Sequence, residues 1–355
     1  MHVKIGELDL GEKLILAPMA DITDKSFRRI AKEFGAGLTF TQMVSAEGVV
    51  LNNFETLRFL SFSQQEKPIG VQLLGNDPDL MYDAVKEIEK FNPDVIDLNI
   101  GCSVSKVTKL NFGASLLDNP SLLSKIVTKM KLASSKTPIS VKMRLGKDSS
   151  HINILENAKL VEDSGADFIV VHCRTRTDKY EVPANWNFLD KIKSSISIPV
   201  VANGSLFKVE DIINLKNRFA PDGFMIARGA IGNPFVFLRY NAFVEQNILL
   251  DEPSVEEIQS TLHKHSYYLI EDYGEDKAIQ KIKKHAIWYF MNEPGIFELI
   301  DRIFSFDNFS SFFEFINEHV FKIKNNQYKN IDSALIPKLF NEKINFWELG
   351  VENKF

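Results

Sequence analysis

The 355-residue sequence predicts an α/β fold, a (β/α)8 barrel of the TIM type, followed by a C-terminal all-helical domain. Two observations support this prediction. Between residue 14 and about residue 227, short apolar runs alternate with amphipathic stretches of helical periodicity, and eight such units in roughly 215 residues match a closed barrel. Beyond about residue 240, apolar residues recur only at helical spacing, and no convincing strand is found.

Each predicted strand is nearly continuous in apolar residues, which is typical of parallel strands buried on both faces. In chain order the runs are LILAP (14–18), LTFTQMV (38–44), IGVQLL (69–74), VIDLNI (95–100), PISVKMR (138–144), FIVVHC (168–173), PVVANG (199–204) and GFMIA (223–227). A doubly wound open sheet is the alternative fold, but no GxGxxG turn follows the first strand. We therefore place a barrel domain at residues 1–245 and a helical domain at residues 246–355.

The composition excludes several classes of protein. Hydrophobic residues make up 45% of the chain and charged residues 25%, as in ordinary globular proteins. No apolar run approaches the roughly 20 residues of a membrane helix, and the N-terminus lacks a basic-then-apolar export signal. Two cysteines exclude a disulfide scaffold and suit a reducing compartment. We therefore expect a cytoplasmic protein without membrane segments, acting as a monomer.

Polar side chains gather at the C-terminal ends of the predicted strands, the end at which (β/α)8 barrels carry their active sites. In chain order they are Gln72, Asn99, Cys102, Lys142, Arg144, His172, Arg174, Asn203 and Arg228. A single buried glutamine usually only satisfies backbone groups. Several polar side chains on consecutive strands at one rim instead indicate a site.

The last two loops, ANGS (202–205) and ARGAIGNP (227–234), follow the strands where barrels commonly bind a phosphate. Their glycines let backbone N–H groups approach an anion, and a helix starting near Gly229 would direct its positive end toward it. Arg228 can add a bidentate contact. Two tight turns are the alternative interpretation, because glycine suits those equally.

Strand alternation places the Lys142 side chain inside the barrel, where an unpaired cation is costly. A ligand with a phosphate and an anionic ring would satisfy both Lys142 and the glycine loops. Reduced flavin mononucleotide (FMN) is such a ligand, and Gln72 and His172 could bond its ring edge. Cys102, taken alone, has an ordinary explanation as a small buried hydrophobe.

Several motifs, in order and in register, resemble the tRNA-dihydrouridine synthases across roughly residues 14–240. They are LAPMADITDKSFRRIAKEFGAGLTFTQMVSA, VQLLGNDP, IDLNIGC, KMRLG, VHCRT and ANGS…MIARGAIGNPF. KIKKHAIWYFMNEPG (281–295) also resembles the helical domain of the bacterial members. The resemblance implies an FMN-binding barrel followed by a helical domain that helps to hold tRNA.

The resemblance also implies roles for individual residues. FMN contacts would come from Pro18, Met19, Ala20, Gln72, Lys142, His172, Asn203, Gly204, Ser205, Ala227 and Arg228. The target base would lie near Asn99, Arg144 and Arg174. The family reduces the C5–C6 double bond of uridine: N5 of reduced FMN delivers hydride to C6, and Cys102 would protonate C5, with NADPH or NADH as the reductant. A thiol near its ordinary pKa of about 8.5 is protonated at neutral pH, and a flexible loop after Cys102 could close over the base.

Four positions depart from the usual family pattern, without removing a reacting group. Ser103 stands where a proline is usual, Gln42 where a glutamate is common, Ser205 replaces an aspartate, and Ala227 replaces a glycine. These departures bear on loop geometry and substrate preference.

Basic residues cluster where RNA phosphates would approach, although the net charge of the chain is −5. Around the barrel mouth they are Lys106, Lys109, Arg144, Lys147, Arg174, Arg176 and Lys179. Lys281, Lys283, Lys284 and His285 form a second cluster, for which a solvated helix face is the alternative. His263, His265 and His285 lack metal-ligand spacing, so we expect no metal site.

Two other functions remain open at this stage. One is a small-molecule FMN oxidoreductase of the dihydroorotate dehydrogenase kind, which the basic clusters and the helical domain disfavour. The other is a flavin-retaining RNA-binding protein without turnover, which intact Cys102 and Lys142 disfavour. Dependence of activity on folded tRNA separates the first from a tRNA enzyme, and an rRNA target stays possible.

Overall fold

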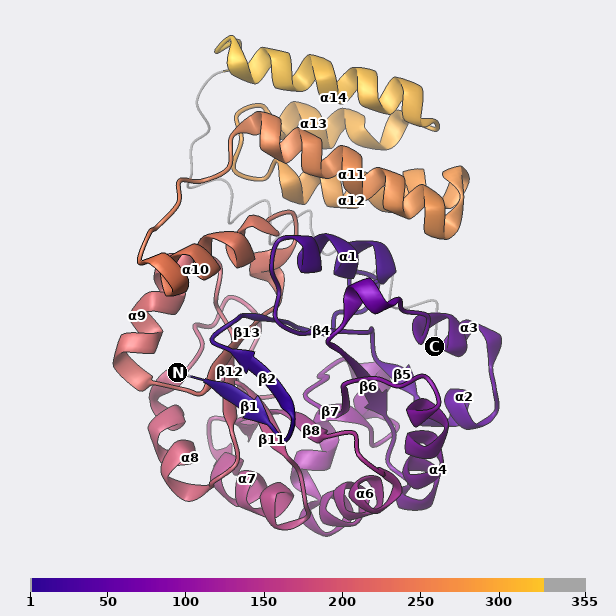
Figure 1. The fold of residues 1–355 in the computed structure, drawn as a ribbon, viewed down its shortest axis with the longest axis vertical. Helices are drawn as coiled ribbons and strands as arrows, with labels where there is room; N and C mark the ends of the chain where they lie inside the picture. Colours follow the sequence, from indigo (N-terminus) through magenta and orange to yellow (C-terminus); the bar gives the residue numbers. More distant parts are fainter. Residues whose placement is uncertain (1, 329–355) are drawn as a thin grey trace. The chain divides into compact units, whose positions relative to one another are not determined.

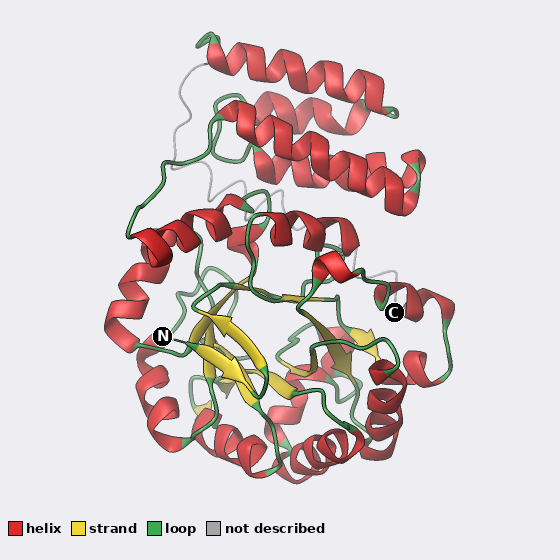
Figure 2. Ribbon diagram, in the orientation of Figure 1, coloured by secondary structure: helices red, strands yellow, loops and turns green. Residues whose placement is uncertain are grey.

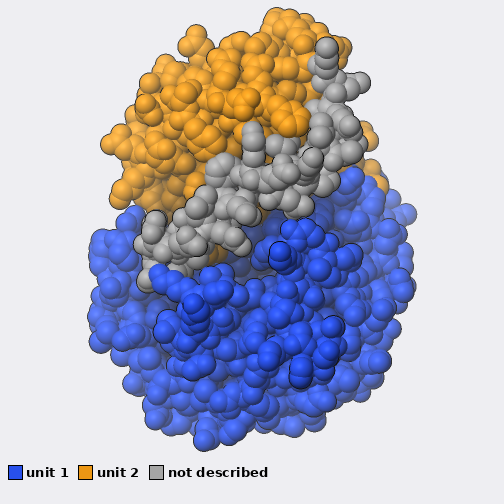
Figure 3. All heavy atoms as spheres, turned by 180° about the vertical axis from the view of Figure 1, so that it is seen from behind, with its two compact units in different colours: residues 1–19, 23–229, 236–248 blue, residues 20–22, 230–235, 249–355 orange. Residues whose placement is uncertain are grey.

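The computed structural model describes residues 2–328, so the last part of the predicted helical domain, residues 329–355, lies outside the described residues. Two compact units are found. The first comprises residues 1–19, 23–229 and 236–248, and the second comprises residues 20–22, 230–235 and 249–355; Figure 3 colours them blue and orange. Each unit is considered by itself below.

The first unit is a closed parallel barrel, as the sequence predicts (Figures 1 and 2). Its strands, in their order around the barrel, are β3 (Ile15–Leu16), β13 (Gly223–Ile226), β12 (Val200–Asn203), β11 (Phe168–His172), β8 (Ile139–Arg144), β7 (Val95–Ile100), β6 (Ile69–Leu74) and β4 (Thr39–Phe40). A parallel bridge between Ile15 and Leu38 joins the two ends of this order and closes the barrel.

The second strand is interrupted, which the sequence did not indicate. Both β4 and β5 (Val44–Ser45) pair with β6, on either side of a break. Four residue steps separate Phe40 from Val44, against three between their partners Gly70 and Leu73. This extra residue is a β-bulge, at which the Thr41 hydroxyl accepts the N–H of Gln72.

Helices surround the barrel (Figure 2), and local signals explain where several of them begin. Asp24, Asp77 and Asn119 each cap a helix through a side-chain oxygen, and a proline follows the cap in two cases. The longer helices of this unit are α1 (Lys25–Glu33), α4 (Pro78–Glu89), α6 (Pro120–Ala133), α7 (Ile154–Asp163), α8 (Leu189–Ser195), α9 (Val209–Phe219) and α10 (Phe235–Gln246). Shorter ones, α2 (Ala46–Val50) and α3 (Phe54–Phe59), follow β5.

An N-terminal hairpin that the sequence analysis did not predict covers the N-terminal end of the barrel. It consists of β1 (Val3–Ile5) and β2 (Leu8–Gly11), and crosses the barrel in Figure 1. Val3, Ile5 and Leu10 are buried in one hydrophobic cluster with barrel residues such as Phe168. The apolar hairpin therefore closes this end and leaves the opposite end for chemistry.

Three aspartates at the same N-terminal end tie neighbouring strands together. Asp94, Asp167 and Asp222 directly precede β7, β11 and β13. Each accepts the first backbone N–H of the adjacent strand at 2.7–2.8 Å, the donors being Ile69, Ile139 and Val200. Each also pairs with a lysine, respectively Lys67, Lys131 and Lys193.

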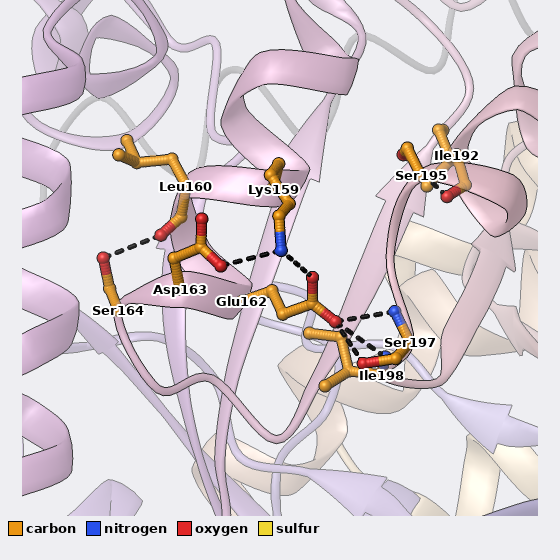
Figure 4. Close-up of polar contacts among 9 residues, drawn as sticks. All are labelled: Lys159, Leu160, Glu162, Asp163, Ser164, Ile192, Ser195, Ser197 and Ile198. Atoms are coloured by element: carbon orange, nitrogen blue, oxygen red, sulfur yellow. Dashed lines mark hydrogen bonds and ion pairs between the residues drawn. The ribbon is translucent and has the colours of Figure 1, made fainter.

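Two glutamates hold loops at this end as well. Glu162 of α7 accepts hydrogen bonds from Ser197 N (2.6 Å), Ser197 Oγ (2.5 Å) and Ile198 N (3.2 Å), and it pairs with Lys159 (Figure 4). The bond from the Ser197 hydroxyl is the main cause that lowers the pKa of Glu162 to about 2. Glu89 of α4 binds the loop before β8 in the same way, through Ser134 and Ser135.

The described part of the second unit is helical, in agreement with the sequence. Its helices are α11 (Val255–Tyr273), α12 (Glu275–Tyr289), α13 (Ile296–Arg302) and α14 (Phe309–Lys324). The side chains of Ser254 and Glu257 form a reciprocal cap at the start of α11. Among residues 2–328, none of the helices combines the length and apolar character that crossing a membrane requires.

Candidate active site

A chain of side-chain hydrogen bonds joins β6, β7 and β8 inside the barrel. Asn99 Nδ2 donates to Gln72 Oε1 (2.8 Å), and Gln72 Nε2 donates to Asp97 Oδ2 (2.7 Å). Ser140 Oγ donates to the other oxygen of Asp97 (2.6 Å). Register explains the assembly, because Gln72 pairs with Asp97, Asp97 with Ser140, and Asn99 with Lys142.

Asp97 is a site residue that the sequence analysis missed. Its side chain is buried, and burial raises its pKa to about 6, against the opposing effects of Gln72, Ser140 and Lys142. The residue was counted within an apolar strand. A lone carboxylate in such a strand, two residues before Asn99 and so on the same face, was the signal that could have revealed it.

Lys142 lies inside the barrel, as the strand alternation predicts. Its Nζ donates to Asn203 Oδ1 (3.4 Å), while Asn203 Nδ2 donates to the backbone oxygen of Met225 (2.7 Å). Burial lowers the pKa of Lys142 to about 8; the neighbouring Arg144 lowers it further and Asp97 raises it. Lys142 therefore remains a cation at neutral pH, with an amide oxygen as its hydrogen-bond partner.

Cys102 follows the end of β7 and is anchored there by Asn99. The Asn99 side-chain oxygen accepts the backbone N–H groups of Gly101 (3.0 Å) and Cys102 (2.9 Å). Burial raises the pKa of the Cys102 thiol, and the positive charges of Arg144 and Lys142 offset this only in part. The thiol is consequently protonated at neutral pH.

The segment after Cys102, which we expected to be a loop, contains two short helical stretches, and its flexibility stays a prediction. These stretches are α5 (Ser105–Thr108) and a 3-10 helix at Gly113–Asp118. Gly113 has φ +61° and approaches Cys102 so closely that a Cβ there would lie 2.8 Å from the Cys102 oxygen. The backbone N–H of Ala114 donates to that same oxygen (2.9 Å), so the segment folds back onto the cysteine.

Arg144 and Arg174 are buried and hold loops at the barrel mouth. Arg144 donates to the backbone oxygens of Gly101 (2.8 Å) and Thr175 (2.6 Å). Arg174 donates to the backbone oxygens of Val182 and Tyr180 and to Ser205 Oγ, the last at 2.7 Å. Their proximity to a target base stays a prediction, and a loop-holding role that we had not foreseen is added to it.

His172 is a neutral acceptor toward Arg174. Burial, followed by the charges of Arg144 and Lys142, holds the pKa of His172 well below its usual value. Its Nε2 lies 3.2 Å from Arg174 Nη1, and a guanidinium only donates. The proton of the neutral ring is therefore on Nδ1, which leaves a donor for another partner.

The two glycine-rich loops contact each other. Gly204 and Ser205 have φ +126° and +46°, and a Cβ on Gly229 would lie 2.1 Å from the backbone oxygen of Leu206. The guanidinium of Arg228 lies over the rings of Tyr180 (4.2 Å) and Phe207 (5.2 Å).

The expectation that a helix starts near Gly229 is wrong. Only a 3-10 turn, Arg228–Ala230, is found there, and α10 begins at Phe235. Gly232 has φ +66° and Pro234 lacks an N–H, so a continuous helix cannot start earlier.

The remaining predicted cofactor contacts occupy loops after strands. Pro18 and Met19 follow β3, and the backbone of Met19 exchanges hydrogen bonds with the Thr23 hydroxyl, both 3.0 Å. Ala227 follows β13. Ala20 belongs to the second compact unit.

The predicted RNA-contacting residues differ in exposure. Lys106, Lys109, Lys147 and Lys179 are exposed. Arg176 instead pairs with Asp118 at 3.0 Å.

The four residues of the second basic cluster do not share one exposed face of their helix. Lys281 and Lys284 are partly exposed, whereas Lys283 and His285 of α12 are buried. Lys283 lies on the apolar stripe of that helix with Ile282, its Nζ 4.0 Å from Asp307, and His285 packs edge-on against His265. Within residues 2–328, no group of three or more His, Cys, Asp or Glu side chains is arranged to hold a metal ion.

Comparisons with known proteins point in one direction. The family model described as dihydrouridine synthase matches residues 15–324. The chain is 34% identical to tRNA-dihydrouridine synthase B of Pasteurella multocida over 287 residues, which cover 81% of this chain and 86% of that one. It is 32% identical to a probable tRNA-dihydrouridine synthase of Rickettsia prowazekii, over 82% of this chain and 90% of the relative.

A solved structure shares the fold. The 6-hydroxypseudooxynicotine amine oxidase of Pseudomonas geniculata superposes with a TM-score of 0.56 at 14% identity. The match covers 73% of this chain but only 52% of that protein, so the chain spans about half of it.

Proposed function

The chain belongs to the dihydrouridine synthase family, and we propose that it reduces the C5–C6 double bond of specific uridines in tRNA. The observation that carries this proposal is that a protonated thiol, Cys102, and an inward cation, Lys142, are both found at the C-terminal end of the barrel. Bound FMN, reduced by NADPH or NADH, would supply the hydride to C6.

The donor set fits a flavin with an anionic ring edge and a phosphate. Lys142 is a half-buried cation without a hydrogen-bonded carboxylate among the residues described, and the neutral His172 ring has an Nδ1 proton to donate. Gln72 has its amide held by two neighbours and could meet the ring edge. The proposed ring contacts are thus supplied by β6, β8 and β11.

Backbone N–H groups and Arg228 would hold the phosphate. Gly204 and Ser205 both have positive φ, so the backbone turns sharply here and could present N–H groups to an anion. Arg228 is kept in place by the rings of Tyr180 and Phe207. Pro18, Met19, Ala20, Asn203 and Ala227 complete the proposed cofactor contacts.

Cys102 would act as the acid that protonates C5. A proton donor must hold its proton until hydride arrives, and burial of this thiol ensures that. Asn99 fixes the position of Cys102 through its backbone N–H. Arg144 fixes the preceding Gly101, so the acid is held on a rigid element.

Recognition of tRNA would depend on exposed cations around the mouth. Lys106, Lys109, Lys147 and Lys179 are exposed on segments that follow β7, β8 and β11. These lysines would contact phosphates without reading sequence. A uridine must leave its stack to reach the interior, so flipping of the base is part of the proposal.

Mass spectrometry of unmodified tRNA incubated with purified protein, FMN and NADPH tests the function. We expect dihydrouridine at defined positions, and repeating the assay with NADH identifies the reductant. An NADPH-reducible yellow protein that leaves every tRNA uridine intact would contradict the tRNA substrate. We further propose that the protein is cytoplasmic, which cell fractionation tests, and that it is a monomer, which size-exclusion chromatography tests.

A further inference from the structure

Asp97 lies inside the barrel on β7, and the reaction proposed above gives it no task. Its side chain is 1% exposed, although a carboxylate is costly to bury. We propose that Asp97 positions the flavin-facing amide of Gln72, which Asn99 links to the Cys102 loop. This inference rests on the proposed function, because it concerns the same cofactor site.

The direction of the hydrogen-bond chain supports the proposal. Asn99 Oδ1 is occupied by two backbone N–H groups, so its Nδ2 must face Gln72 Oε1. An ionised carboxylate only accepts, so Gln72 must turn its amino group toward Asp97. The oxygen of the Gln72 amide therefore faces Asn99 and its nitrogen faces Asp97. The second N–H of Gln72 is the one that remains to meet the cofactor.

The charge of Asp97 also acts on Lys142. The charged or polar groups that face Asp97 are Gln72 from β6 and Ser140 and Lys142 from β8. Lys142 lowers the pKa of Asp97, and Asp97 raises that of Lys142, so each stabilises the charged form of the other. Asp97 thus helps to keep the cation that would face the flavin.

Protonation of Asp97 should weaken both effects. A neutral carboxyl group accepts a weaker hydrogen bond than a carboxylate, so Asn99 alone then holds the amide of Gln72 firmly. Burial raises the pKa of Asp97 to about 6, which places this change just below neutral pH. Burial, together with the charges of Arg144 and Lys142, holds the pKa of His172 well below its usual value. We therefore expect FMN affinity to fall as the pH drops through about 6.

The test is a titration of the full chain with FMN at several pH values between 5 and 8. Quenching of flavin fluorescence measures binding at each pH. Asp97→Asn keeps the side-chain shape and removes the charge. Asp167→Asn is the matched control, because its carboxylate is likewise held by hydrogen bonds, from Ile139 N and Lys131 Nζ, but at the opposite end of the barrel. We expect Asp97→Asn to bind FMN about tenfold more weakly at pH 7.5, with shifted absorption bands and a smaller change of affinity around pH 6, where only the FMN phosphate then titrates. The control should match the wild type.

A second variant keeps the test decisive if Asp97→Asn does not fold. Ser140→Ala removes a hydrogen bond that lowers the pKa of Asp97 and leaves the charge in place. The midpoint of the pH dependence should then move upward. A midpoint that does not move would overturn the proposal.

Other outcomes are equally informative. Equal losses of affinity in Asp97→Asn and Asp167→Asn would show a general effect on the barrel and overturn the inference. Unchanged affinity and spectrum in Asp97→Asn would do the same, while leaving the proposed function standing. A wild-type protein that binds no FMN would instead overturn the proposed function itself.

Discussion

Lysines at the two ends of the barrel have different partners. At the N-terminal end, Lys131 and Lys193 lie 2.5–2.8 Å from the carboxylates of Asp167 and Asp222. At the C-terminal end, Lys142 is half-buried and its hydrogen-bond partner is an amide oxygen, 3.4 Å away. The lysines at the first end thus neutralise the aspartates that tie neighbouring strands together, whereas Lys142 has no such carboxylate partner and is proposed to face a ligand.

The pKa values of carboxylates at the two ends, Glu162 and Asp97, also differ. Hydrogen bonds from Ser197 lower the pKa of Glu162 to about 2, so this group is ionised at any working pH. Burial raises the pKa of Asp97 to about 6, within reach of neutral pH. Both pKa values are perturbed, but only that of Asp97 is moved toward neutral pH, which makes Asp97 the candidate for a functional role.

Replacement of Cys102 should have the largest effect. We expect Cys102→Ala to slow dihydrouridine formation by about 10²- to 10⁴-fold, because the acid is lost. Cys173→Ala is the control, since this buried cysteine lies one residue from His172 and is not a proton donor in the proposal. Quantitative mass spectrometry of tRNA measures both, and flavin absorbance checks that each variant is loaded. Comparable rates in the two variants would remove Cys102 from the mechanism.

Replacement of Lys142 should have the next largest effect. Lys142→Met should weaken FMN binding about 10- to 100-fold, because a charge-assisted contact is lost. The contribution requires a protonated lysine, so the difference from the wild type should shrink as the pH rises through about 8. Fluorescence titration at several pH values measures this.

Lys131→Met provides the matched change at the other end. Its side chain is 42% exposed, so the lost pair should cost about 0–1 kcal/mol of stability. FMN affinity should stay within about twofold of the wild type, since distant sites act independently. Equal losses of affinity in the two lysine variants would erase the distinction between the ends.

The barrel and most of the site could be predicted from the sequence because both follow from strand alternation. Gln72, Asn99 and Lys142 are polar residues on otherwise apolar strands, and parallel register brings their side chains to one rim. The role of Cys102 came from the resemblance to a family, since a lone cysteine has several explanations. The N-terminal hairpin was missed because its two strands are only three and four residues long.

The remaining differences depend on contacts between distant segments. The place of Arg174 near the target base stays a prediction, but its hydrogen bonds to Tyr180 and Ser205 were not foreseen. Lys283 was grouped with surface cations by charge alone. Its spacing of three and four residues from Ala286 and Ile279 places it on the buried face, and that signal was available in the sequence.

At the N-terminal end, Glu162→Gln should reduce stability without changing catalysis. Loss of charge-assisted hydrogen bonds to Ser197 and Ile198 should cost about 1–2 kcal/mol at pH 7. The folded-state pKa is lowered to about 2, so the wild-type advantage is complete above the unfolded pKa of about 4.3 and declines as the pH falls toward 2. Urea unfolding between pH 3 and pH 7 measures this trend. A difference that grows on acidification would contradict the assignment.

Replacement of one exposed lysine should have the smallest effect and extends the comparison to RNA. Lys106 lies on α5, which follows Cys102, whereas Lys90 ends α4 at the opposite end of the barrel. Lys106→Ala should weaken tRNA binding about threefold and reduce the slope of affinity against salt by about 1, because one phosphate contact is lost. Lys90→Ala changes the net charge equally and should alter neither quantity. Filter binding at several salt concentrations distinguishes a local phosphate contact from a general charge effect, because only a local contact depends on which end of the barrel carries the lysine.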